Sequence, residues 1–389
     1  MSKIYLDYAA TTPCDPRVAK AMSGFLKKDF GNASSIHNFG QKASMALGAA
    51  RQNLAEFLGC ESEEIVFTGS ATEADNLAIF GIVKAAGAAH PHIITSQIEH
   101  AAVLESFRAL EKLGTQVTYL PVGKDGIVEI PEIKKAIRPN TVLVSIMYAN
   151  NEIGTIEPIA EISDLIKKIN PKILFHTDAV QAVNFLDCNV KKLGVDLLTL
   201  SSHKIYGPKG VGALYVKKGV PITPIIYGGG HERGLRSGTE NVAGIVGLGQ
   251  AIKEVQNPKL KIHNIRIRQF RDKLIKTILK IIPASRLNGS LTRRLSNNVN
   301  ISFDGVEGEA VVVALDQKGI AASTGSACSS TSLEPSHVLM ALGLSEEQSH
   351  GSLRLTLGKY NTLKDIERVI KVLPEVIQKL RKISGYNQR

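Results

Sequence analysis

The sequence predicts an α/β protein whose core is a mostly parallel β-sheet covered by helices. Between residues 63 and 218, short apolar runs alternate with stretches of helical period. The runs are apolar almost throughout, as expected for strands that are buried on both faces of a sheet. Several of them end in polar residues, which is typical of sheets that bind ligands beyond the carboxyl ends of their strands.

The predicted strands follow one another at short intervals along this region. In chain order they lie in EEIVFT, HIITSQIEH, QVTYLPV, TVLVSIMYAN, KILFHTDAVQ, VDLLTLSSHK and GVGALYV. Segments 72–87 and 158–169 between them carry the helical period. This regular alternation predicts strands joined by helical crossovers.

The chain is long enough for more than one domain, because 389 residues exceed a single ordinary core. Its character changes after GGG at 228–230 and a helical segment that ends at about 256. A basic helix and the run SNNVNISFDG follow. We therefore predict a large domain over 13–257 and a smaller α/β domain formed by 1–12 and 258–389.

Composition indicates a globular protein without a membrane span. Hydrophobic residues make up 43% of the chain and the mean hydropathy is +0.02. No run approaches the roughly 18 consecutive apolar residues that a span requires. The start, MSKIYLDYAATTP, lacks the long apolar core of a secretory signal. We expect a cytoplasmic protein.

The formal net charge of +11 raises the possibility of an acidic partner such as nucleic acid. The densest basic stretch, residues 259–276, also has near-helical apolar spacing, with Ile262, Ile265, Phe270 and Leu274 expected on or near one face. A solvated amphipathic helix is the favoured interpretation. The sequence contains no phosphate-loop, zinc-finger or RNP pattern, so we expect no direct nucleic-acid binding.

Three residues at strand ends suggest a cofactor site. Lys204 follows an apolar run, and a partly desolvated lysine there could form a Schiff base with a carbonyl. Asp178 ends FHTD and could keep a pyridinium nitrogen protonated, or simply cap a helix. Thr72 begins a helix whose amides could hold a phosphate, a role compatible with capping.

The cysteines, Cys14, Cys60, Cys188 and Cys328, form no CxxC pair, so neither a disulfide scaffold nor a zinc or other metal site is predicted. Cys328 lies within STGSACSSTS at 323–332. A run of small polar residues is typical of a flexible linker. An exposed thiol in such a run is more readily explained if its reactivity is used.

The sequence resembles the cysteine desulfurases of the IscS/NifS type, which are class V aminotransferase-like, fold-type I pyridoxal phosphate enzymes. The resemblance covers nearly the whole chain, with the stretches in the same order as in that family. They are LDYAATTP, ATEADNLAI, EHAAV, NNEIG, HTDAVQ, SSHKIYGPKG, GGGHERGLRSGTEN, TGSACSS and LEPSHVLMALG.

The resemblance implies a role for each residue that matches a family motif. Lys204 would bind the cofactor covalently and move the substrate α-proton, and His100 would stack on the cofactor ring and assist. The other implied cofactor contacts are Asp178 at the pyridine nitrogen, Gln181 at the phenolic oxygen, and Ala71, Thr72, Ser201 and His203 at the phosphate, with Thr239 reaching the phosphate from the neighbouring subunit of a homodimer. Asn151 and Arg354 would hold the substrate carboxylate.

The implied reaction converts L-cysteine to L-alanine and leaves the sulfur on Cys328 as a persulfide. A long loop of small residues, about 322–336, would let Cys328 reach both the cofactor and an acceptor protein. That acceptor could be an iron–sulfur scaffold or a tRNA-thiolation carrier. A selenocysteine lyase or aminotransferase on the same fold stays open, as does a non-catalytic basic adaptor.

Overall fold

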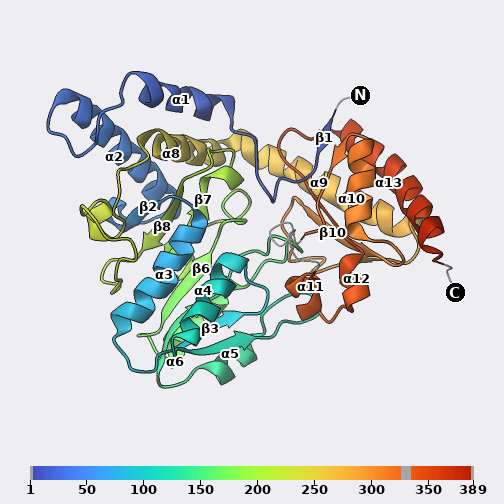
Figure 1. Ribbon diagram of the computed structural model, residues 1–389, viewed down its shortest axis with the longest axis horizontal. Helices are drawn as coiled ribbons and strands as arrows, with labels where there is room; N and C mark the ends of the chain where they lie inside the picture. Colours follow the sequence, from blue (N-terminus) through green and yellow to red (C-terminus); the bar gives the residue numbers. More distant parts are fainter. Residues whose placement is uncertain (1–2, 326–333, 387–389) are drawn as a thin grey trace.

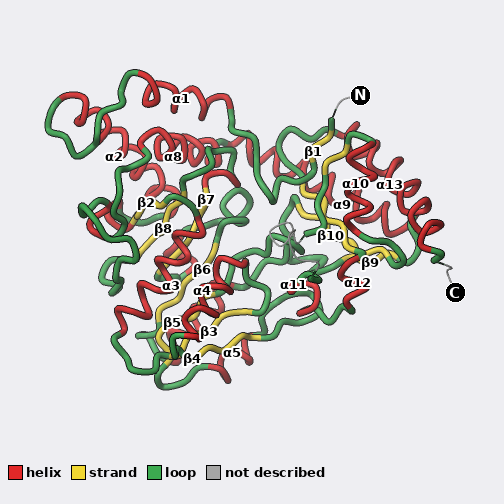
Figure 2. The backbone as a smooth tube through the Cα atoms, in the orientation of Figure 1, coloured by secondary structure: helices red, strands yellow, loops and turns green. Residues whose placement is uncertain are grey.

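The computed structural model describes residues 3–325 and 334–386 (Figure 1). Cys328 lies outside the described residues. The strands form one large sheet and two small ones, shown in yellow in Figure 2. Helices α1, α2 and α8 lie along one side of the large sheet, and α9 to α13 gather at the other end of the molecule (Figure 1).

The large sheet has seven strands in the order β2-β8-β7-β6-β5-β3-β4. Neighbouring strands from β7 across to β4 are all parallel, whereas β8 pairs antiparallel with both β7 and β2. The mostly parallel sheet predicted from the sequence is therefore confirmed. The strands are β2 (Ile65–Thr68), β3 (His92–Ser96), β4 (Gln116–Leu120), β5 (Thr141–Ser145), β6 (Leu174–Asp178), β7 (Leu197–Ser201) and β8 (Gly212–Val216).

Helices cover both faces of this sheet because neighbouring strand residues point to opposite sides. Phe67 packs in a core with α1, α2, α6 and α8, whereas Val66 packs in a second core with α3 and α4. The helices of this region are α1 (Pro16–Lys27), α2 (Asn38–Leu58), α3 (Ala71–Ala86), α4 (Ala101–Lys112), α5 (Ile130–Ala136), α6 (Ile159–Ile169), α7 (Val190–Leu193) and α8 (Val242–Gln256).

A separate core lies in the C-terminal region and includes Ile4 and Leu6 from the N-terminus. Its sheets are β12-β10-β9 and β1-β11. This arrangement supports our proposed domains, 13–257 and 1–12 with 258–389. The elements are β1 (Ile4–Tyr5), α9 (Pro258–Ile281), β9 (Ser285–Leu287), β10 (Asn298–Phe303), α10 (Gly308–Gln317), β11 (Ile320–Ala321), α11 (His337–Ala341), α12 (Glu346–His350), β12 (Ser352–Thr356) and α13 (Leu363–Ser384).

The basic stretch does form a helix, α9, but its buried face differs from the one expected. Ile267, Leu274 and Ile278 are buried, while Ile262 and Ile265 are 67% and 61% exposed. At about 100° per residue, Ile262 and Ile265 lie roughly 140° and 160° around the helix from Ile267. The expectation that Ile262 and Ile265 share the apolar face was wrong.

None of the helices in the described ranges is both long enough and apolar enough to cross a membrane.

Two helical glycines allow a test of the packing between α2 and α8. A Cβ at Gly249 in α8 would lie 2.8 Å from the Cα and Cβ atoms of Ala50 in α2. A Cβ at Gly24 in α1 would meet only Asp29 Oδ2, at 3.8 Å. Both changes to alanine gain the same helix propensity, about 0.5–1 kcal/mol. Only the change at Gly249 also forces α2 and α8 apart, which should lower the free energy of unfolding by about 1–3 kcal/mol.

We therefore expect Gly249→Ala to lower the thermal unfolding temperature and Gly24→Ala to leave it unchanged or raise it. Differential scanning calorimetry of the two variants beside the wild type measures this. Equal unfolding temperatures for the two variants would contradict the close approach of α2 to α8.

Candidate active site

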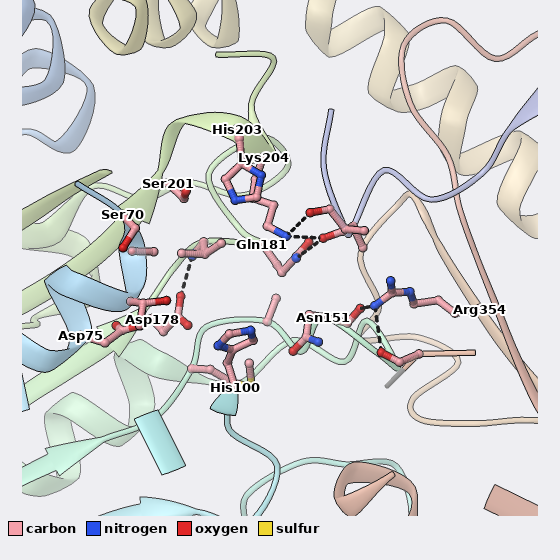
Figure 3. A pocket seen from close by; sticks show the side chains of 18 residues that line it. Ser70, Asp75, His100, Asn151, Asp178, Gln181, Ser201, His203, Lys204 and Arg354 are labelled. Atoms are coloured by element: carbon pink, nitrogen blue, oxygen red, sulfur yellow. Dashed lines mark hydrogen bonds between the residues drawn. The ribbon is translucent and has the colours of Figure 1, made fainter. Parts of the chain in front are cut away.

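A cavity of about 340 Å³ opens beyond the carboxyl ends of β5, β6 and β7 (Figure 3). Most of its lining comes from the large sheet region, but Arg354 of β12 and the N-terminal residues Ala9 and Ala10 close one side. The cavity therefore lies where the two cores meet. Strand ends in a parallel sheet converge at one edge, which is the usual place for a ligand.

The structure brings most of the predicted site residues together around this cavity. Thr239 is exposed and does not line it. Gly325, the last described residue before Cys328, does line it. The predicted residues in the lining are Ala71, Thr72, His100, Asn151, Asp178, Gln181, Ser201, His203, Lys204 and Arg354.

Lys204 ends a short 3-10 turn, Ser202–Lys204, directly after β7. Its Nζ donates to the carbonyl oxygens of Ala9 and Ala10, each at 2.6 Å. Two residues on, Tyr206 has a φ of 64°, a strained conformation for a residue other than glycine. The Tyr206 backbone N–H donates to Thr12 Oγ1 at 2.8 Å, which helps to hold this turn.

His100 is the N-cap of α4, and its Nδ1 accepts a hydrogen bond from the backbone N–H of Ala102 at 3.1 Å. Because Nδ1 is the acceptor, a neutral ring carries its proton on Nε2. The ring lies beside the cavity, between Asp178 and Asn151 (Figure 3). Its position allows it to hold or move a proton at Nε2.

Asp178 is the last residue of β6 and is buried. It accepts a hydrogen bond from the backbone N–H of Val180 at 2.9 Å. Burial raises the pKa of Asp178, although the nearby His100 and Lys204 act in the opposite direction. A buried carboxyl of this kind is suited to a cationic N–H donor.

The start of α3 forms the wall of the cavity that faces away from Arg354 (Figure 3). Ser70 is the N-cap and accepts from the backbone N–H of Glu73 at 3.1 Å, and Ala71 and Thr72 form the first turn. Gly212 of β8 allows a close approach, because a Cβ there would lie 2.7 Å from the carbonyl carbon of Ser70. The amides of a helix start favour an anion such as a phosphate.

His203 borders the same wall and is uncharged at neutral pH. Burial, together with Lys204 and Lys209, lowers the pKa of His203 to about 4. Its Nδ1 lies 3.1 Å from Thr11 Oγ1.

Arg354 and Asn151 line another side of the cavity. Arg354 Nη1 donates to the carbonyl oxygens of Asn151 and Gly325, at 2.9 and 3.3 Å (Figure 3). Arg354 Nε and Asn151 Oδ1 are buried and have no hydrogen-bond partner in the described part of the chain. A guanidinium with an unused donor beside a cavity suits a carboxylate ligand.

Sequence reasoning missed several contributors to the site. Ala9 and Ala10 act through backbone carbonyls, which side-chain chemistry does not reveal. Asp75 lines the cavity from α3, and burial together with Asp178 raises its pKa. Its spacing of three residues from Thr72 places it on the same helix face and could have signalled it.

Comparisons with known proteins identify the family of this chain. Residues 4–369 match the aminotransferase class-V family. The chain is 52% identical over 386 residues to a cysteine desulfurase IscS of Dictyoglomus turgidum, covering 99% of this chain and 97% of that one. A solved NifS-like protein matches with a TM-score of 0.91 at 37% identity, covering 97% of this chain and 100% of the other. A structure of SspA in complex with cysteine has a TM-score of 0.82 at 38% identity, covering 93% and 100%.

The chain therefore belongs to the class-V aminotransferase family, whose members are pyridoxal phosphate enzymes of fold type I. Within that family it is similar to the cysteine desulfurases of the IscS type. The cavity fits the cofactor that this family uses. Lys204 offers an amine, Asp178 a buried carboxyl and the start of α3 an anion site, all around one cavity.

Glu99, the buried neighbour of His100, provides a test of how the residues around the site are held. Its Oε1 accepts from Ser96 Oγ at 2.5 Å and from the Met147 backbone N–H at 3.0 Å. Burial raises the pKa of Glu99 from 4.5 to about 8, so folding favours its protonated form. An unfolded chain ionises near 4.5, and the wild type therefore loses stability as pH rises from about 4.5 to about 8.

We expect Glu99→Gln to remove this loss, because glutamine keeps the acceptor oxygen and cannot ionise. The difference in the free energy of unfolding, variant minus wild type, should grow between pH 5 and pH 8 at a slope of at most about 1.4 kcal/mol per pH unit, and then level off. Thermal unfolding across this range measures it. A difference that does not vary with pH would show that Glu99 is ionised in the folded protein.

Proposed function

We propose that this protein is a cysteine desulfurase that converts L-cysteine to L-alanine and transfers the sulfur to Cys328 as a persulfide. One observation carries the proposal: Lys204 and Arg354 face the same cavity, with Gly325 at its edge three residues before Cys328. The amine, the carboxylate and the thiol of one small amino acid could thus be engaged together. The similarity to IscS cysteine desulfurases supports it.

Pyridoxal phosphate, when bound, withdraws electrons from the substrate amino acid and so allows its carbon–sulfur bond to break. Lys204 would bind the cofactor covalently, Asp178 would hold its pyridine nitrogen and Gln181 its phenolic oxygen. Its phosphate would contact Ala71, Thr72, Ser201 and His203, with Thr239 supplied by a second subunit. These assignments rest on the family motifs and on the positions of the residues around the cavity.

The side chains of this protein would carry out the remaining steps. Arg354 and Asn151 would orient the substrate carboxylate, and the Lys204 amine and His100 Nε2 would hold and move the α-proton. The Cys328 thiolate would attack the substrate sulfur, so that a sulfur–sulfur bond forms as the carbon–sulfur bond breaks. L-Cysteine and a thiol become L-alanine and a persulfide, with no outside oxidant or reductant.

We also propose a homodimer. Phe30 and Ile36, between α1 and α2, and Phe39, in the first turn of α2, are 71%, 92% and 53% exposed. Large apolar side chains gathered at one place on a surface are typical of an interface. A second copy would cover them and could supply Thr239 to the site. The sulfur acceptor would be a cytoplasmic carrier protein, either an iron–sulfur scaffold or a tRNA-thiolation carrier.

Replacing Cys328 separates the desulfurase from the neighbouring activities. We expect Cys328→Ala to abolish alanine formation from L-cysteine, because no thiol remains to accept the sulfur, while the cofactor absorption stays. Chromatography of alanine and mass spectrometry of the Cys328 peptide in the wild type measure this. Cys14→Ala serves as the control. Full alanine formation in Cys328→Ala would favour a lyase that does not use this thiol, and no alanine from either protein would favour an aminotransferase.

Mixed dimers test whether Thr239 acts across the interface. We expect Lys204→Ala and Thr239→Ala each to lack most activity as homodimers. A dimer with one subunit of each kind pairs an intact Lys204 with an intact Thr239 from the other subunit, so about half of the wild-type activity should return. Activity of tandem-tagged mixed dimers measures it. No recovery would place Thr239 in the same subunit as the Lys204 that it serves.

A further inference from the structure

Arg354 already has an acidic partner within the protein. Its Nη2 donates to Asp7 Oδ1 at 2.9 Å, and the side chains of Arg354 and Asp7 are 3% and 20% exposed. Within the described ranges, Asp7 is the acidic side chain that forms a salt bridge with Arg354. A cation so well buried is stabilised by such a pair, because an isolated one would lose its hydration without compensation.

The backbone fixes Asp7 in this position. Asp7 forms a parallel bridge with Thr356 at the end of β12, the strand that carries Arg354. The backbone N–H of Thr356 donates to the Leu6 carbonyl at 2.7 Å, and the backbone N–H of Ala9 donates to Thr356 Oγ1 at 2.9 Å. These bonds on either side of Asp7 keep its carboxylate beside Arg354.

The guanidinium of Arg354 would remain in place without the negative charge of Asp7. Its Nη1 is held independently by the carbonyl oxygens of Asn151 and Gly325. An asparagine at position 7 could still accept from Nη2 through its side-chain oxygen. The charge of Asp7 and the placement of Arg354 can therefore be separated by one substitution.

A ligand carboxylate at Arg354 would come close to Asp7. Nε, which has no acceptor in the described structure, lies on the same edge of the guanidinium as Nη2. A carboxylate that engages this edge would share one guanidinium with Asp7. Two carboxylates so placed repel each other, and a partly buried site screens this repulsion poorly.

We propose that Asp7 weakens the binding of the carboxylate shared by substrate and product, and thereby favours release of the amino acid product. The proposal rests on the proposed function, in which Arg354 binds that carboxylate. Asp7 neutralises the buried guanidinium between turnovers and opposes tight binding during them. Removing only its charge should strengthen carboxylate binding.

The test compares two ligands on the holoenzyme by titrating the cofactor absorption. L-Alanine carries the carboxylate, and L-alaninol replaces it with a neutral hydroxymethyl group. We expect Asp7→Asn to bind L-alanine about tenfold more tightly than the wild type does, while L-alaninol affinity stays within about twofold. Asp7→Ala, which also lacks the charge, should change the affinities in the same direction and serves if the asparagine variant folds poorly.

Glu132→Gln is the matched control, because Glu132 forms an exposed pair with Lys135 on α5. It should change neither affinity. Unchanged or weaker L-alanine binding in both Asp7 variants would overturn the proposal, as would an equal change for both ligands. The titration needs no turnover, so a wild type that forms no alanine from L-cysteine would refute the proposed reaction and leave the comparison of affinities valid.

Discussion

The hydrogen bonds from Lys204 Nζ to the carbonyl oxygens of Ala9 and Ala10 join the two halves of this molecule at the candidate active site. Lys204 extends from the large sheet, whereas the N-terminal segment is bound to the strand that carries Arg354. The shape of the cavity therefore depends on both cores. Neither core alone supplies an amine and a guanidinium facing one another.

Burial determines the charges within this cavity. Burial raises the pKa values of Glu99, Asp75 and Asp178, and so opposes negative charge on these three carboxyls. A cofactor with a cationic ring nitrogen would meet carboxyls that gain from ionising beside it. On the other side, Arg354 and Asp7 balance each other, so a bound amino acid changes the local charge only through its own groups.

The sequence predicts those parts of the structure that depend on local patterns. Strand runs and their polar ends identified the sheet and placed Asp178 and Lys204 at its edge, and family motifs added Arg354. Contacts set by long-range register could not be predicted, because Asp7 meets Arg354 only through the pairing of segments nearly 350 positions apart. The buried face of α9 was misassigned because two exposed isoleucines fit the helical period only approximately.

The strand ends converge on Lys204, the lysine that we propose binds pyridoxal phosphate. Borohydride reduction of the holoenzyme, followed by peptide mapping, tests this proposal most directly, since reduction makes the bond between lysine and cofactor permanent. We expect a pyridoxyl group on the peptide that contains Lys204 and on no other. A label on a different lysine, or a protein that takes up no cofactor, would contradict it.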